Sequence, residues 1–117
     1  MAMKPNFVRK KKRKVHGATF WDKEYTNPEH LKLSMNESED LAKFTRWLIR
    51  RKRGDLLSTE STVLDVGCGN GRNLIYLAHQ FGIHGVGIDI SSAAIAQAKQ
   101  ASKDFAIDYH VGSAANP

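Results

Sequence analysis

Apolar residues recur at helical spacing near the middle of the chain, at Leu41, Phe44, Trp47 and Leu48. This spacing predicts one amphipathic helix over about residues 37–53. Asn36, followed three residues later by Glu39, resembles a capping box at its start, and Gly54 marks its end. Residues 17–35 mix aromatic residues with turn formers, so we expect an irregular or briefly helical segment there.

Short apolar stretches alternate with helical patterns in the second half of the chain. We predict strands over about residues 63–66, 85–90 and 105–111, and helices over about residues 71–81 and 92–103. The first of these helices ends at Gly82, and Ser91 caps the second. Their inward residues are Leu74, Leu77, Ala78 and Phe81, then Ile95, Ala98 and Ala101 or Ser102. Strands joined by helices predict right-handed crossovers and a parallel sheet of order 3-2-1.

The composition is that of one small globular domain. The chain has 117 residues, of which 41% are apolar, so we expect a core and exclude several domains. Its apolar runs are too short to cross a bilayer, and no apolar block follows the basic start as a secretion signal requires. A single cysteine cannot form an internal disulfide, which fits a reducing compartment. We therefore expect a soluble, cytoplasmic protein without a membrane partner.

Basic charge is concentrated at the N-terminus. Residues 1–16 hold seven Lys or Arg and no acid, whereas residues 17–117 hold 11 basic and 12 acidic residues. We interpret residues 1–16 as a solvated, disordered arm with nonspecific affinity for polyanions such as RNA or DNA. Two alternatives remain open: a specific nucleic-acid contact, or a nuclear-import signal, which Lys10 to Val15 resembles. A second cluster, Arg50–Arg53, ends the predicted helix, where cations complement the helix dipole.

The segment VLDVGCGNGRN, residues 63–73, carries the candidate chemistry. A strand that runs into Gly67, Gly69 and Gly71 lets the backbone turn sharply and approach a ligand, while the next helix offers unpaired N–H groups to an anionic one. Asp89 ends the second strand, 22 residues after Gly67. A carboxylate there can accept hydrogen bonds from both hydroxyls of a ribose. The turn and the acid together predict a nucleoside-containing cofactor.

Glycine spacing separates the candidate cofactors. The dinucleotide fingerprint G-x-G-x-x-G would place its third glycine at position 72, which is Arg72. A bulky side chain there disfavours a dehydrogenase-like site for a pyrophosphate. No G-K-[ST] follows the glycines, so the segment is not a P-loop.

These motifs resemble those of the class I S-adenosylmethionine-dependent methyltransferases. Asp65, Gly67, Gly69 and Gly71 match the family's first motif, and GVGIDIS, residues 85–91, resembles its second. The resemblance covers about residues 60–115. It implies an α/β, Rossmann-like fold, a parallel sheet with helices on both faces.

The resemblance also implies roles toward S-adenosyl-L-methionine. The turn from Gly67 to Gly71, Cys68 included, would face the methionine portion of the cofactor, and Asp65 would help to place its amino group. Asp89 would bind the ribose hydroxyls, and Ile90 would pack against the adenine.

Two further segments fit this resemblance. Ser113 and Ala114 follow Gly112 where the family often has Gly-Asp-Ala, so Ser113 would hydrogen-bond adenine without a formal charge. The segment FWDKEY, which ends at Tyr25, resembles N-terminal caps that close over the cofactor with an aromatic ring near the sulfonium. We therefore divide the chain into the arm, 1–16, a helical cap, 17–58, and the first half of a cofactor-binding domain, 59–117.

The expected function is methyl transfer from S-adenosyl-L-methionine to an unidentified small molecule, RNA or protein. No catalytic residue is nominated, because in the family acceptor-side groups usually follow the fourth strand. The five histidines lack ligand spacing, so no metal site is expected, and we interpret Cys68 as a packing residue rather than a nucleophile. The alternative is a nonenzymatic nucleic-acid- or nucleotide-binding module that works through the basic arm.

The predicted order leaves the strand of the glycine turn at an edge of the sheet. An apolar parallel strand there lacks half of its ladder partners. We therefore expect this sequence to be the N-terminal portion of a larger protein, apparently truncated after the third strand. We further expect the isolated chain to be marginally folded and inactive as a transferase.

Overall fold

The computed structural model describes residues 17–27 and 34–115. The basic arm predicted for residues 1–16 lies outside the described residues. Within them, no helix is long and apolar enough to span a membrane.

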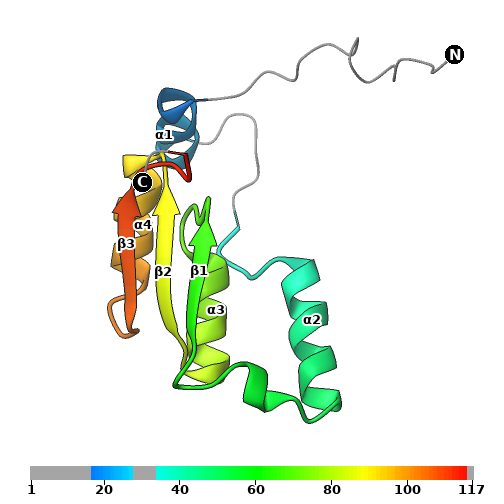
Figure 1. Ribbon diagram of the computed structural model, residues 1–117. Helices are drawn as coiled ribbons and strands as arrows, with labels where there is room; N and C mark the ends of the chain where they lie inside the picture. The colour runs from blue at the N-terminus through cyan, green and yellow to red at the C-terminus, as the bar shows by residue number, and fades with distance from the viewer. Residues whose placement is uncertain (1–16, 28–33, 116–117) are drawn as a thin grey trace, which may run out of the picture.

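Three parallel strands form the centre of the fold (Figure 1). They are β1 (Thr62–Val66), β2 (His84–Asp89) and β3 (Ile107–Val111), hydrogen-bonded in the order β1-β2-β3. Asp65 pairs with Gly87, which pairs with Tyr109. The predicted parallel sheet and its strand order are confirmed, although β2 begins and ends one residue earlier than predicted.

Two helices connect the strands, α3 (Arg72–Phe81) after β1 and α4 (Ser92–Ala101) after β2. Both lie behind the sheet in Figure 1, as two successive right-handed crossovers in the same direction require. The described residues thus cover one face of the sheet, where the family resemblance implied helices on both. On the other face, Leu64 and Val66 of β1 are exposed.

The core lies between the sheet and these two helices. Its most deeply buried apolar side chains are Leu74, Ile83, Ile95 and Ala98. Tyr109 also points into it, and its hydroxyl shares a hydrogen bond of 2.7 Å with the buried Ser102 Oγ. Of the inward residues predicted for α4, Ser102 is therefore buried, whereas Ala101 is exposed.

The predicted end of α3 and the predicted cap of α4 are confirmed, although α4 ends at Ala101, two residues before the predicted end. Gly82 ends α3 in the left-handed conformation, with φ of 69°. Ser91 caps α4, because its hydroxyl accepts a hydrogen bond of 3.0 Å from the Ala94 N–H.

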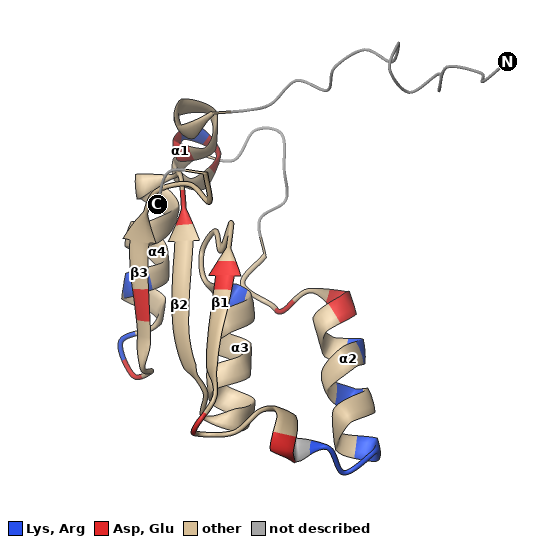
Figure 2. Ribbon diagram, in the orientation of Figure 1, with Lys and Arg blue, Asp and Glu red and all other residues tan. Residues whose placement is uncertain are grey.

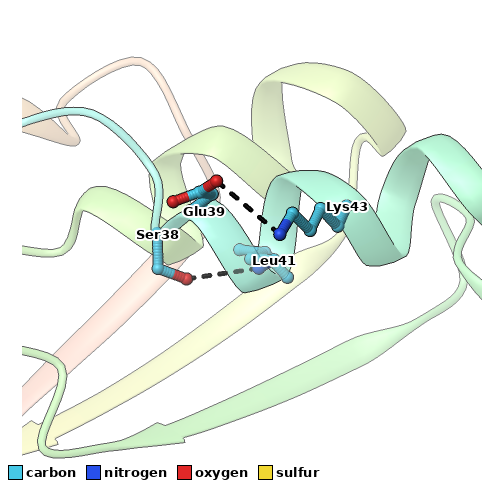
Figure 3. A network of polar contacts seen from close by, with 4 residues as sticks. All are labelled: Ser38, Glu39, Leu41 and Lys43. Carbon is cyan, nitrogen blue, oxygen red and sulfur yellow. Dashed lines mark hydrogen bonds and ion pairs between the residues drawn. The ribbon is translucent and has the colours of Figure 1, made fainter.

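Two helices precede the sheet, α1 (Ala18–Thr26) and α2 (Glu39–Arg50), so the segment expected to be irregular or briefly helical begins with a short helix. The cap of α2 is Ser38 rather than the predicted Asn36. Its hydroxyl accepts a hydrogen bond of 3.3 Å from the Leu41 N–H, beside an exposed Glu39–Lys43 ion pair (Figure 3). Capping boxes match many sequences, and tertiary contacts select the residue that takes the cap.

The end of α2 also differs from the prediction. The helix ends at Arg50, and Lys52 adopts a left-handed φ of 54° before the short 3-10 turn η2 (Gly54–Leu56). Leu48 is fully buried, whereas Phe44 and Trp47 stack on each other and stay largely exposed. Gly54 therefore begins η2 instead of ending the helix.

Candidate functional site

The glycine turn after β1 is held against the end of β2. The N–H groups of Gly67 and Cys68 both donate to the Ile88 carbonyl oxygen, at 2.7 and 3.0 Å. Gly67, Gly69 and Gly71 all have positive φ, a conformation that disfavours residues with a Cβ. Three alternating glycines are therefore what the backbone needs to return so abruptly into α3.

Asp89, the last residue of β2, accepts hydrogen bonds from the glycine turn and from the start of α4. Its Oδ2 accepts a hydrogen bond of 2.8 Å from the Gly69 N–H, and its Oδ1 accepts one of 2.9 Å from the Ser91 N–H. A carboxylate can accept about four hydrogen bonds, so each oxygen retains acceptor capacity for a ligand. Acidic residues lie near the carboxyl ends of both β1 and β2 (Figure 2).

A hollow of about 330 Å³ opens at this carboxyl edge of the sheet. Three strand ends and helix α1 form its walls. They contribute Trp21 and Tyr25 from α1, Val66 and Gly67 after β1, Ile88, Asp89 and Ile90 at β2, and Gly112, Ser113 and Ala114 after β3. Five predicted site residues thus meet in one place: Gly67, Asp89, Ile90, Ser113 and Ala114.

Asp65 lies elsewhere, in a second cavity between β1, α2 and α3. Burial raises the pKa of its carboxyl group, and the nearby Asp89 carboxylate raises it further, while Arg72 opposes both effects. Asp65 is thus close enough to influence the hollow electrostatically without lining it. Its predicted contact with the cofactor's amino group stays a prediction.

Cys68 is buried within the turn, and its Sγ lies 3.7 Å from the Gly69 carbonyl oxygen. Burial, followed by the charges of Asp89 and Asp65, raises the pKa of the thiol to about 12. Nucleophilic cysteines require a lowered pKa. The burial and raised pKa of Cys68 suit a packing group better than a nucleophile.

Gly69 and Gly71 do not line the hollow, because each is covered by a tyrosine hydroxyl. A Cβ at Gly69 would strike the hydroxyl of Tyr25, and one at Gly71 would strike that of Tyr109. Burial raises the pKa of Tyr25, and the Asp89 carboxylate adds to this effect. Helix α1 thus places a neutral aromatic side chain directly over the glycine turn.

Sequence reasoning missed Asp22, which joins α1 to the start of α4. Its Oδ1 accepts hydrogen bonds from the Ser91 hydroxyl at 2.6 Å and from the Ala93 N–H at 3.0 Å. The Ala93 N–H, and then the Ser91 hydroxyl, hold the pKa of this carboxyl below its usual value. The only sequence signal was an acid within the FWDKEY segment, which does not identify a partner 69 residues away.

Sequence reasoning also missed how the turn holds the segment before α2. The Asn70 amide donates to the Ser34 carbonyl oxygen at 3.0 Å, and Asn73 Oδ1 accepts from the Ser38 N–H at 2.8 Å. Arg72 Nη1 donates to the Asn36 carbonyl oxygen at 3.3 Å. Residues 34–38 therefore cross the N-terminus of α3. Throughout the described ranges, no three His, Cys, Asp or Glu side chains converge as metal ligands would.

Comparisons with known proteins agree with the fold described above. Residues 63–117 match the family described as "Methyltransferase domain". Among solved structures, the chain is similar to YjhP from E. coli, at 27% identity and a TM-score of 0.58, over 81% of this chain and 37% of that one. The predicted Rossmann-like fold is confirmed.

Two further similar structures were solved in complex with S-adenosyl-L-homocysteine. The S-adenosylmethionine-dependent methyltransferase from Thiobacillus denitrificans is 28% identical, with a TM-score of 0.55, over 76% of this chain and 35% of that one. The one from Geobacter sulfurreducens is 27% identical, with a TM-score of 0.54, over 78% and 35%. The chain thus spans less than two fifths of the length of each of these three structures.

Gly71→Ala is expected to destabilise the fold more than Gly67→Ala. Both positions have positive φ, but a Cβ at Gly71 would lie 3.1 Å from Tyr109 Cζ and 3.2 Å from Ala98 Cβ, whereas Gly67 faces open space. We expect an additional loss of about 1–3 kcal/mol in the free energy of unfolding from this overpacking. Urea unfolding followed by circular dichroism measures the free energy of unfolding of both variants. Equal losses would show that the Tyr109 side chain can shift to accommodate the Cβ without an energetic cost.

Cys68 should resist alkylation in the native chain. At pH 9, a thiol with a pKa of about 12 is ionised in about one molecule in a thousand, so iodoacetamide should react several hundredfold more slowly than with the chain unfolded in guanidinium chloride. Mass spectrometry of timed samples gives the rate, with glutathione as the reference thiol. A native rate equal to that of glutathione would contradict the raised pKa.

Proposed function

Since residues 63–117 match the methyltransferase domain family, as their motifs predicted, we propose that this chain binds S-adenosyl-L-methionine and takes part in methyl transfer. The acceptor is a small molecule, an RNA or a protein. The observation that carries the proposal is the convergence of Asp89, the glycine turn and two aromatic side chains on one hollow.

The walls of the hollow match the parts of an adenosyl group. The Asp89 carboxylate retains acceptor capacity toward a ribose, although two backbone N–H groups already fix its orientation. Ile90 and Ala114 offer apolar surface to an adenine ring, and Ser113 offers a hydroxyl. The volume of about 330 Å³ lies at the lower end of the range for small-molecule sites.

Helix α1 supplies the remaining wall. Trp21 and Tyr25 are four residues apart and line the same hollow, with ring centroids 6.4 Å apart. Aromatic rings attract cations through their faces, so these side chains suit a positively charged sulfonium. The methionine portion would then lie along the turn at Gly67, with α1 shielding it from water.

The bound cofactor would supply an activated methyl group, because its carbon–sulfur bond breaks as the acceptor's electron pair attacks and sulfur leaves as a neutral thioether. The contribution of this chain is to hold the donor in one orientation and exclude water from it. No described residue of the hollow is nominated as a base. A dehydrogenase-like dinucleotide site is disfavoured by Arg72, which stands where the fingerprint requires glycine.

Asp89→Asn should weaken the binding of S-adenosyl-L-homocysteine. The substitution removes the charge and one acceptor oxygen, so we expect a loss of about 1–3 kcal/mol, or about 5- to 150-fold in affinity. Isothermal titration calorimetry of the chain measures this loss, with Asp108→Asn, an exposed acid on β3, as the control of equal charge change. Unchanged affinity in Asp89→Asn, or binding of NAD without S-adenosyl-L-homocysteine, would refute the proposal.

We also propose that the basic arm gives the protein nonspecific affinity for RNA. Seven cations without an acid in residues 1–16 should release counterions from phosphates, so binding should fall steeply as salt rises. Deleting residues 1–16 should abolish this salt-dependent binding in a fluorescence anisotropy titration with a labelled oligonucleotide. Affinity for S-adenosyl-L-homocysteine should not change, and RNA binding that survives the deletion would exclude the arm.

A further inference from the structure

We infer that Asp22 is a positioning residue that docks α1 over the hollow and thereby sets the affinity for the cofactor. The inference rests on the proposed function and extends it, because Asp22 itself does not line the hollow. It acts through Trp21 and Tyr25, which do.

Helix α1 has little intrinsic stability. It spans nine residues, its N-cap residue Gly17 has no side chain to cap it, and its first turn has no acid. Isolated helices shorter than about 12 residues are marginal in water. Contacts with the rest of the protein must therefore stabilise α1 and fix its place.

Asp22 makes the most concentrated of these contacts. A single oxygen, Oδ1, accepts from the Ser91 hydroxyl at 2.6 Å, the Ala93 N–H at 3.0 Å and the Ser92 hydroxyl at 3.4 Å. The N–H groups in the first turn of a helix have no partner within the helix and lie at the positive end of its dipole, and both features favour a carboxylate at the start of α4. One turn further along α4, the Gln97 amide donates to the Tyr25 carbonyl oxygen.

The same contacts continue to the proposed ribose site. Ser91 is fully buried, and while its hydroxyl donates to Asp22, its N–H donates to Asp89 Oδ1 at 2.9 Å. Asp89 Oδ2 in turn accepts from the Gly69 N–H. A continuous series of hydrogen bonds thus links Asp22, Ser91, Asp89 and the glycine turn. It fixes the position of α1 relative to the Asp89 carboxylate on the other side of the hollow.

This geometry makes the affinity for a ligand depend on the position of Asp22. Trp21 precedes Asp22 directly and Tyr25 follows it by less than one turn, so the tie at Asp22 lies between the two aromatic walls. When the tie is lost, both rings can move away from Asp89 together. The affinity of the hollow should therefore depend on a side chain that never touches the ligand.

The test measures docking of α1 and ligand binding separately. In a Trp47→Phe background, Trp21 is the only tryptophan, so its fluorescence reports the position of α1 without any ligand. Asp22→Ala, Asp22→Asn and the control Asp104→Ala, an exposed acid in the turn after α4, are compared. Isothermal titration calorimetry with S-adenosyl-L-homocysteine then gives the affinity of each variant.

We expect Asp22→Ala to shift Trp21 emission to longer wavelength and to weaken S-adenosyl-L-homocysteine binding about tenfold, the effect of losing one or two net hydrogen bonds. Asp22→Asn should fall between Asp22→Ala and the wild type, because it keeps an acceptor oxygen but not the charge. Asp104→Ala should behave as the wild type. Circular dichroism melts show whether each variant remains folded, and if Asp22→Ala does not, Gln97→Ala removes the second tie instead.

The outcomes separate this inference from the proposed function. Unchanged Trp21 emission and unchanged affinity in a folded Asp22→Ala variant would overturn the positioning role. A wild-type chain that binds no S-adenosyl-L-homocysteine would refute the proposed function, while an emission shift in Asp22→Ala would still support docking by Asp22. Rescue of both readouts by Asp22→Asn supports a role for the hydrogen bonds in particular.

Discussion

The orientation of the Asp89 carboxylate is the constraint on which the candidate site depends. One oxygen accepts a hydrogen bond from the Gly69 N–H in the turn after β1, and the other accepts one from the N–H of Ser91, the N-cap of α4. The same side chain therefore fixes the two backbone segments between which a ligand would lie. A carboxylate that is oriented before binding loses little conformational entropy when a ligand arrives. Burial of Asp65, Cys68 and Tyr25 raises the pKa of each of these groups, and the nearby Asp89 carboxylate raises it further.

Side chains are excluded from Gly69 and Gly71 because protein atoms pack against them, whereas Gly67 borders open space where a ligand would lie. Tyr25 and Tyr109 occupy the positions where side chains at Gly69 and Gly71 would lie, whereas Gly67 faces the open hollow. The three glycines of the motif thus serve different purposes, although all three share positive φ. Two allow close approach of protein side chains, and one leaves room at the wall of the hollow. The separation explains why only Gly67 among them lines the candidate site.

Local patterns predicted the sheet, the two crossover helices and the glycine turn, because apolar periodicity and glycine spacing act over a few residues. They also predicted that Asp89, Ile90 and Ser113 lie at one edge of the sheet, because the carboxyl ends of parallel strands meet at the same edge. Contacts between distant segments were beyond such patterns. The N–H of Ser38 bonds to Asn73, which helps to explain why Ser38 and not Asn36 caps α2. Asp22 reaches Ser91 across 69 residues, and no periodicity encodes that pairing.

The chemistry available in the hollow is that of holding a donor rather than activating an acceptor. Among its described lining residues, only Asp89 and Tyr25 titrate. Both oxygens of Asp89 already accept hydrogen bonds from backbone N–H groups, and under the proposed function their remaining acceptor capacity serves a ribose. Burial and the Asp89 charge raise the pKa of Tyr25, so its hydroxyl stays protonated near neutral pH. Under the proposed function, Asp89 is occupied by the ribose and Tyr25 keeps its proton, so neither group serves as a base for an acceptor. Under the proposed function, recognition of the adenosyl group would come from β1, β2, β3 and α1, whereas choice of the acceptor would require groups outside this hollow.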